Sequence, residues 1–81
     1  GLPQANQIER EVPVGLELSL TEKHVLVQIP ENWGQILQTN PPLAQLWRTH
    51  SREVFEHYFQ QGYRAVDFVR NPNRYVLERD D

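Results

Sequence analysis

Residues 51–68, SREVFEHYFQQGYRAVDF, change their hydrophobic period at a single glycine, and this change decides the fold. Before Gly62 the apolar residues recur every three or four positions, which predicts an amphipathic helix. After it, Val66 and Phe68 face one way and Asp67 faces the other, which predicts a strand. Gly62 stands where a left-handed residue is expected to end the helix. The stretch therefore predicts a helix-to-strand corner.

The helix is predicted to run from about residue 41 to residue 61, because Asn40 is suited to capping it and Pro41 to its first position. A shorter helix is expected over ENWGQILQ, residues 31–38. There the apolar residues Trp33, Ile36 and Leu37 recur at helical spacing.

Strands are predicted both before and after the helices in the sequence. Apolar residues alternate from Val12 to Leu20, and HVLVQI at residues 24–29 follows after a short turn, so we expect these two segments to form a hairpin. Tyr75 to Leu77 form the last strand, after a turn at RNPNR.

The predicted fold class is therefore α+β. We expect a small, mostly antiparallel sheet in the order β-β-short α-α-β-β, with one long helix packed across it. Residues 1–11 are polar and are expected to form a tail or a linker from a preceding domain. Residues 12–81 are expected to form a single domain.

Composition excludes several classes of function. The net charge of −3 gives no electrostatic reason to bind nucleic acid. The longest purely apolar run, Val25 to Val27, is too short to span a membrane. The absence of cysteine excludes thiolate metal sites and fits a cytoplasmic location. Because the sequence has no methionine, we expect the chain to be a processed product or a piece excised from a longer protein.

The long helix carries polar groups on the face that should be buried. Its apolar stripe consists of Leu43, Trp47, Val54, Phe55 and Tyr58. Ser51 and the Tyr58 hydroxyl fall near the centre of this stripe, so they need partners in the sheet or in a ligand. One interpretation is a core tyrosine bonded to a backbone carbonyl, and the other is a binding site.

Titratable residues suggest two further sites, each with an ordinary alternative. His50, Glu53 and His57 fit a metal site by spacing, and equally fit a solvated border of the helix. With no fourth ligand at a suitable spacing, we predict no metal site. Asp67 fits a general base only with an acid partner, and none is visible. No glycine-rich loop precedes a helix, so the usual phosphate cradle is missing.

The opening stretch resembles the closing segment of the GNAT acetyltransferase superfamily, whose helix often reads N-x-x-A-x-x-x-Y-x-x-x-G-F. The matching positions here are Ser51, Val54, Tyr58, Gly62 and Tyr63, at the same spacings. Tyr58 and Gly62 are identical to the pattern, and Tyr63 replaces phenylalanine. Ser51 and Val54 depart from it.

A closer resemblance covers residues 25–79, about two thirds of the chain. This segment is similar to the C-terminal part of a group of predicted GNAT-like proteins. The shared motifs are an I-P pair that ends a strand, a W-R pair near the helix start, an R-E-x-F segment and a G-Y-R turn. In this chain they are Ile29–Pro30, Trp47–Arg48, Arg52–Phe55 and Gly62–Arg64.

This resemblance implies a C-terminal part of a GNAT-like acyltransferase that completes the sheet and the acceptor side and is not catalytic alone. The parent protein would be an N-acetyltransferase that holds acetyl-CoA on an upstream Q/R-x-x-G-x-G/A loop. This chain lacks that loop, so it binds no cofactor by itself. Tyr58 corresponds to a tyrosine that protonates the departing CoA thiolate, and Ser51 and Trp47 would contact the acceptor.

Two other functions stay open. One is a non-catalytic protein–protein interaction module. In that case a homodimer partner, instead of the upstream domain, would cover its aromatic residues. The other is a metal-dependent enzyme built on His50, Glu53 and His57, which the missing fourth ligand disfavours.

Overall fold

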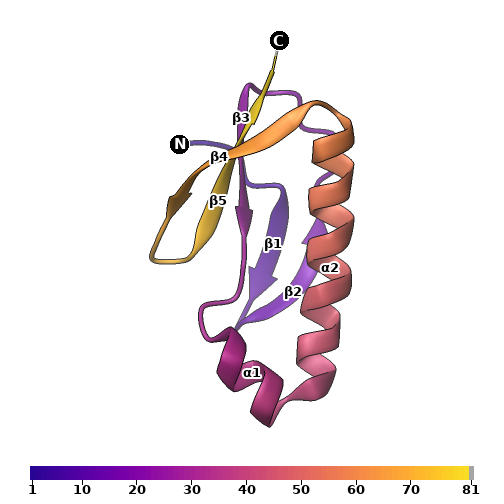
Figure 1. Ribbon diagram of the computed structural model, residues 1–81, viewed down its shortest axis with the longest axis vertical. Helices are drawn as coiled ribbons and strands as arrows, with labels where there is room; N and C mark the ends of the chain where they lie inside the picture. Colours follow the sequence, from indigo (N-terminus) through magenta and orange to yellow (C-terminus); the bar gives the residue numbers. More distant parts are fainter. Residues whose placement is uncertain (81) are drawn as a thin grey trace.

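The computed structural model describes residues 1–80 and confirms the predicted α+β class: five strands form two antiparallel sheets, and one of the two helices is long (Figure 1). The elements in chain order are β1 (Asn6–Glu9), β2 (Val12–Leu16), β3 (His24–Gln28), α1 (Trp33–Thr39), α2 (Pro41–Gln60), β4 (Tyr63–Val69) and β5 (Arg74–Arg79).

Helix α2 begins and ends where the sequence predicted. The Asn40 side chain accepts a hydrogen bond from the Leu43 backbone N–H at 3.2 Å, and Pro41 occupies the first turn. Gly62, just beyond the helix, has a φ of +93°, a conformation that side chains with a Cβ rarely adopt. The chain therefore turns sharply from α2 into β4.

The sheet that contains the last hairpin has the order β3-β5-β4, with β5 antiparallel to both neighbours. Strands β3 and β4 are thus parallel, and the two helices form the long connection that parallel strands require. The register of β4 shifts between Ala65 and Asp67, where Val66 forms a bulge and lies 44% exposed. The simple alternation predicted for this strand is therefore broken.

The predicted hairpin between residues 12–20 and 24–29 does not form. Strand β2 ends at Leu16 and pairs with β1, whereas β3 pairs with β5. The physical reason lies in the segment after Leu16, whose backbone groups bond to two tyrosine hydroxyls, those of Tyr58 and Tyr63, instead of to a neighbouring strand.

The first eleven residues, expected to form a tail, instead contain β1 and two buried residues, Ala5 and Asn6. The Asn6 side chain accepts from the Gln28 N–H at 2.9 Å and donates to the Gln28 carbonyl at 2.8 Å, as a strand backbone does. The Ala5 N–H also donates to the Leu26 carbonyl, at 2.8 Å. These bonds join the β1–β2 pair to β3, so the segment belongs to the fold.

The core lies between α2 and the strands. Val54 and Tyr58 of α2 pack with Val25, Val27 and Leu77 of the sheet, and all five are fully buried. The N-terminal half of α2 extends beyond this core toward α1 (Figure 1), and there it builds the site described next.

Candidate functional site

A pocket of about 300 Å³ opens beside the N-terminal half of α2. Its lining residues are Ile29, Pro30, Trp33, Trp47, Arg48 and Ser51. The structure thus brings together Trp47 and Ser51, the two residues predicted to bind an acceptor. It also brings together the I-P and W-R motifs, which are far apart in the sequence. Their convergence could not be found from spacing, because it depends on how the chain after β3 folds back through α1 against α2.

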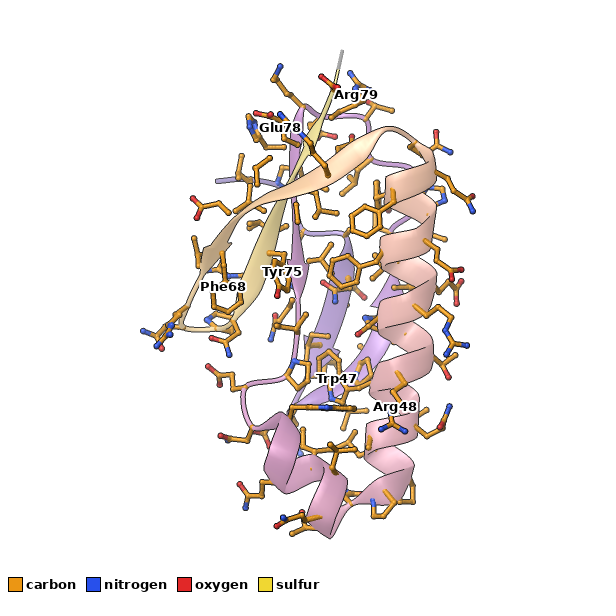
Figure 2. All side chains as sticks on the ribbon, viewed as in Figure 1. Trp47, Arg48, Phe68, Tyr75, Glu78 and Arg79 are labelled. Atoms are coloured by element: carbon orange, nitrogen blue, oxygen red, sulfur yellow. The ribbon has the colours of Figure 1, made fainter. Side chains whose placement is uncertain are left out.

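Trp47 is the fixed wall of this pocket. Its side chain is only 2% exposed, and its indole N–H donates to the Glu11 carbonyl at 3.0 Å. In Figure 2 the ring is seen edge-on, projecting from α2 above α1. The His50 ring packs against it edge-to-face, with centroids 5.8 Å apart. These contacts hold the indole in one orientation, so that it forms a fixed part of the pocket wall.

Arg48 and Ser51 supply the polar groups of the pocket. The Arg48 guanidinium lies 5.6 Å from the centroid of the Trp33 ring, in a cation–π arrangement. Within residues 1–80, Arg48 pairs with no carboxylate, and the Ser51 hydroxyl has no hydrogen-bond partner. Both groups are therefore available to a bound molecule.

The polar side chains of the pocket do not form a nucleophile–base pair. A serine nucleophile needs a base within hydrogen-bond distance, and Ser51 has none among the residues that the structure describes. Four of the six lining residues are aliphatic or aromatic, and Arg48 and Ser51 supply polar side chains. This composition is typical of sites that hold a small molecule by its apolar part and orient it with a few polar contacts.

Tyr58, the predicted catalytic residue, does not line this pocket. Its side chain is fully buried, and its hydroxyl donates to the Glu17 carbonyl at 2.5 Å and accepts from the Leu20 N–H at 3.2 Å. Burial raises the pKa of the phenol above its usual value. The interpretation of Tyr58 as a core tyrosine bonded to backbone is confirmed, whereas its catalytic role stays a prediction.

His50 is directed into the protein and not toward a shared metal position. The Asn6 oxygen accepts from the Gln28 N–H, which places the Asn6 amide nitrogen 3.0 Å from His50 Nε2. Because that nitrogen donates, Nε2 must accept, and the imidazole is neutral with its proton on Nδ1. Burial lowers the pKa of His50, while nearby Glu53 opposes the shift.

His57, the second histidine of the candidate metal site, and Asp67, the candidate general base, both make local contacts. The His57 ring packs edge-on against Tyr58, with centroids 4.8 Å apart. The Asp67 carboxylate accepts from the Phe68 N–H at 2.8 Å on an exposed strand. No group of three metal-ligating side chains occurs in the part of the chain that the structure describes.

A second feature, which the sequence did not predict, is a continuous aromatic surface formed by Phe55, Phe59, Phe68 and Tyr75. Successive ring centroids lie 5.6, 5.9 and 5.2 Å apart along the path from Phe59 through Phe55 and Tyr75 to Phe68. Phe59 is 48% exposed and Phe68 38%. Figure 2 shows Phe68 and Tyr75 side by side on the last hairpin. Only the Phe55–Phe59 spacing was a signal in the sequence, because the Val66 bulge sets the pairing across the hairpin.

A larger cavity of about 390 Å³ shares Ile29, Pro30 and Trp47 with the pocket. Eight of its eleven other lining residues are polar, and they come from the β1–β2 turn, the end of β3, the segment before α1, α1 itself and Asn40. It contains neither Arg48 nor Ser51, so it does not unite the residues singled out by the sequence.

Comparisons with protein-family models, with curated proteins and with solved structures found no match. Within residues 1–80, neither helix combines the length and apolar character needed to cross a membrane. The pocket and the aromatic surface are therefore the observations on which function can be argued.

Proposed function

We propose that this chain is the C-terminal part of a GNAT-like acyltransferase, where it completes the sheet and supplies the acceptor side of the fold without catalysing transfer itself. The observation that carries this proposal is the convergence of the I-P and W-R motifs, with Ser51, on one pocket. Residues that only stabilise a fold need not share a cavity. These residues line one that has the composition of a ligand site.

The surroundings of Tyr58 and Ser51 support a non-catalytic role. A catalytic acid must be able to reach the group it protonates, but the Tyr58 hydroxyl is buried and bonded to two backbone groups. Acetyl-CoA does not fit the pocket either. The pocket is apolar and offers one arginine, and it lacks the row of backbone N–H groups that holds a pyrophosphate. In this proposal the upstream part of the parent protein holds acetyl-CoA.

An NMR titration of the isotope-labelled chain with acetyl-CoA and with CoA tests this role. We expect no saturable shift of the Tyr58 or Ser51 amide signals at millimolar ligand. Saturable shifts at both residues would show that a thioester site exists in this chain and would overturn the non-catalytic assignment.

A second test uses a parent protein that also carries the CoA-binding part. There, Arg48→Gln should raise KM for the acceptor and leave KM for acetyl-CoA unchanged. Arg52→Gln is the matched control, because Arg52 is an exposed arginine one turn further along α2 and does not line the pocket. Equal changes in the two KM values for Arg48→Gln would contradict an acceptor-side role.

The aromatic surface favours a second candidate function, a protein–protein interaction module. Half-exposed aromatic side chains in continuous contact are typical of surfaces that a partner covers. If the partner is a second copy, sedimentation equilibrium should show a concentration-dependent dimer that Phe59→Ser and Phe68→Ser weaken. A chain that stays monomeric at millimolar concentration would exclude the homodimer and leave the upstream domain as the partner.

A further inference from the structure

We propose that the pocket beside Trp47 binds a small molecule that carries a carboxylate on an apolar body, with the carboxylate at Arg48 and the body against Trp33 and Trp47. The further claim that this molecule is the acceptor of acyl transfer rests on the proposed function. The binding itself is measurable on this chain without any acyl transfer.

The size and walls of the pocket define the apolar body. A volume of about 300 Å³ is at the lower limit of ligand sites, which span roughly 300–1,000 Å³. Ile29 and Pro30 supply aliphatic surface and Trp33 supplies flat aromatic surface, while the nearly buried Trp47 closes the wall. Because the Trp47 ring is held by its bond to the Glu11 carbonyl, it is already ordered before a ligand binds. A single aromatic ring or a short branched chain suits such a site.

The charge at the pocket defines the polar end of the ligand. Arg48 has no carboxylate partner among residues 1–80, although the chain has 11 acidic residues. Its guanidinium is positioned over Trp33, and the planar fork of an arginine matches the two oxygens of a carboxylate. Two ion pairs, which join Glu78 with His24 and with Arg64, lie on the sheet and away from this pocket.

Ser51 adds a hydrogen-bonding group on the same side. It follows Arg48 by three residues on α2, so the two side chains share one helix face. Its hydroxyl has no hydrogen-bond partner in the described residues 1–80 and lines the pocket. It is therefore placed to bond a second polar group of the ligand, next to the carboxylate.

The test compares two probes, 3-phenylpropanoate and its neutral amide, by NMR titration of the labelled chain. The chain has two tryptophans, so its two indole N–H signals report on the pocket directly. We expect saturable shifts at Trp33 and Ser51 with both probes. The carboxylate should bind about fivefold more tightly, the equivalent of ~1 kcal/mol for an exposed ion pair.

Two variants separate the charge of Arg48 from general electrostatic attraction. Arg48→Gln should reduce the carboxylate to the affinity of the amide, while Arg52→Gln should leave the fivefold preference intact. Equal affinities of the two probes for the unchanged chain, or a preference retained in Arg48→Gln, would overturn the carboxylate assignment. The absence of any saturable shift with both probes would overturn the pocket as a binding site.

These outcomes are distinguishable from failure of the proposed function. A chain that binds acetyl-CoA refutes the non-catalytic role and leaves the comparison of the two probes unaffected. A chain that binds neither acetyl-CoA nor the probes loses the pocket as a binding site, while the non-catalytic role, which the acetyl-CoA titration tests, stands.

Discussion

Replacing Tyr58 by phenylalanine tests whether this residue is structural. The substitution keeps the buried ring and removes only the hydroxyl, which bonds to the Glu17 carbonyl and the Leu20 N–H. Each such bond contributes about 1 kcal/mol net, so the loss of both should lower the free energy of unfolding by about 2 kcal/mol. For a domain of this size each kcal/mol changes Tm by roughly 4–8 °C, which predicts a decrease of about 8–16 °C.

Urea unfolding followed by tryptophan fluorescence and by far-UV circular dichroism measures this difference. The slope of the free energy with urea should stay unchanged, because the folded state buries the same surface. Tyr75→Phe is the matched control. Tyr75 is 36% exposed, and its hydroxyl has no hydrogen-bond partner in the described part of the chain, so stability should stay within about 0.5 kcal/mol.

A Tyr58→Phe variant as stable as the unchanged chain would refute the reasoning. It would mean that the backbone does not hold the hydroxyl, which would then be free to donate a proton. The catalytic role that the GNAT resemblance implies for Tyr58 would regain support.

Three further predictions concern local features. Since burial lowers the pKa of His50, the unfolded chain binds this proton more readily; stability should be full above about pH 6.5 and fall as the pH drops through the lowered pKa. Denaturation at a series of pH values should show this slope, and His50→Gln should flatten it; an equal slope in both proteins would contradict the lowered pKa of the buried His50. Gly62→Ala should cost about 1 kcal/mol because of the positive φ, while Gly34→Ala in exposed α1 should stabilise by roughly 0.5–1 kcal/mol; effects of the same sign would contradict the conformation of Gly62. Asn6→Ala should cost about 1–3 kcal/mol, because it leaves the Gln28 backbone unpaired, and a neutral effect would restore the expectation of a tail.

Local signals in the sequence predicted both helices and the ends of α2. Asn40 and Pro41 start α2 by capping chemistry, and Gly62 ends it by its backbone freedom. These signals act within a few residues, so neighbouring sequence is sufficient to recognise them.

Strand partners depend on contacts between distant residues, and there the sequence was insufficient. Leu18 and Leu20 continue an alternating pattern but lie outside β2, because the Tyr58 hydroxyl holds that segment by its backbone. The sequence pattern places Asn6 in a polar tail. Its amide instead substitutes for a strand backbone against Gln28, which no periodicity reveals.

The candidate site was predicted in part. Trp47 and Ser51 were singled out on the sequence and lie in one pocket. The availability of Arg48 and the contact between Phe68 and Tyr75 became visible only in three dimensions. Both depend on which side chains occupy the neighbouring space, and sequence spacing does not specify this.

The most direct test of the acceptor-side pocket is an isotope-filtered NOE experiment between unlabelled 3-phenylpropanoate and the labelled chain. The pocket predicts NOEs from the phenyl protons to the rings of Trp33 and Trp47 and to the Ile29 methyl groups. NOEs to Phe59 and Phe68 in their place would put the ligand on the aromatic surface and contradict the assignment of the pocket.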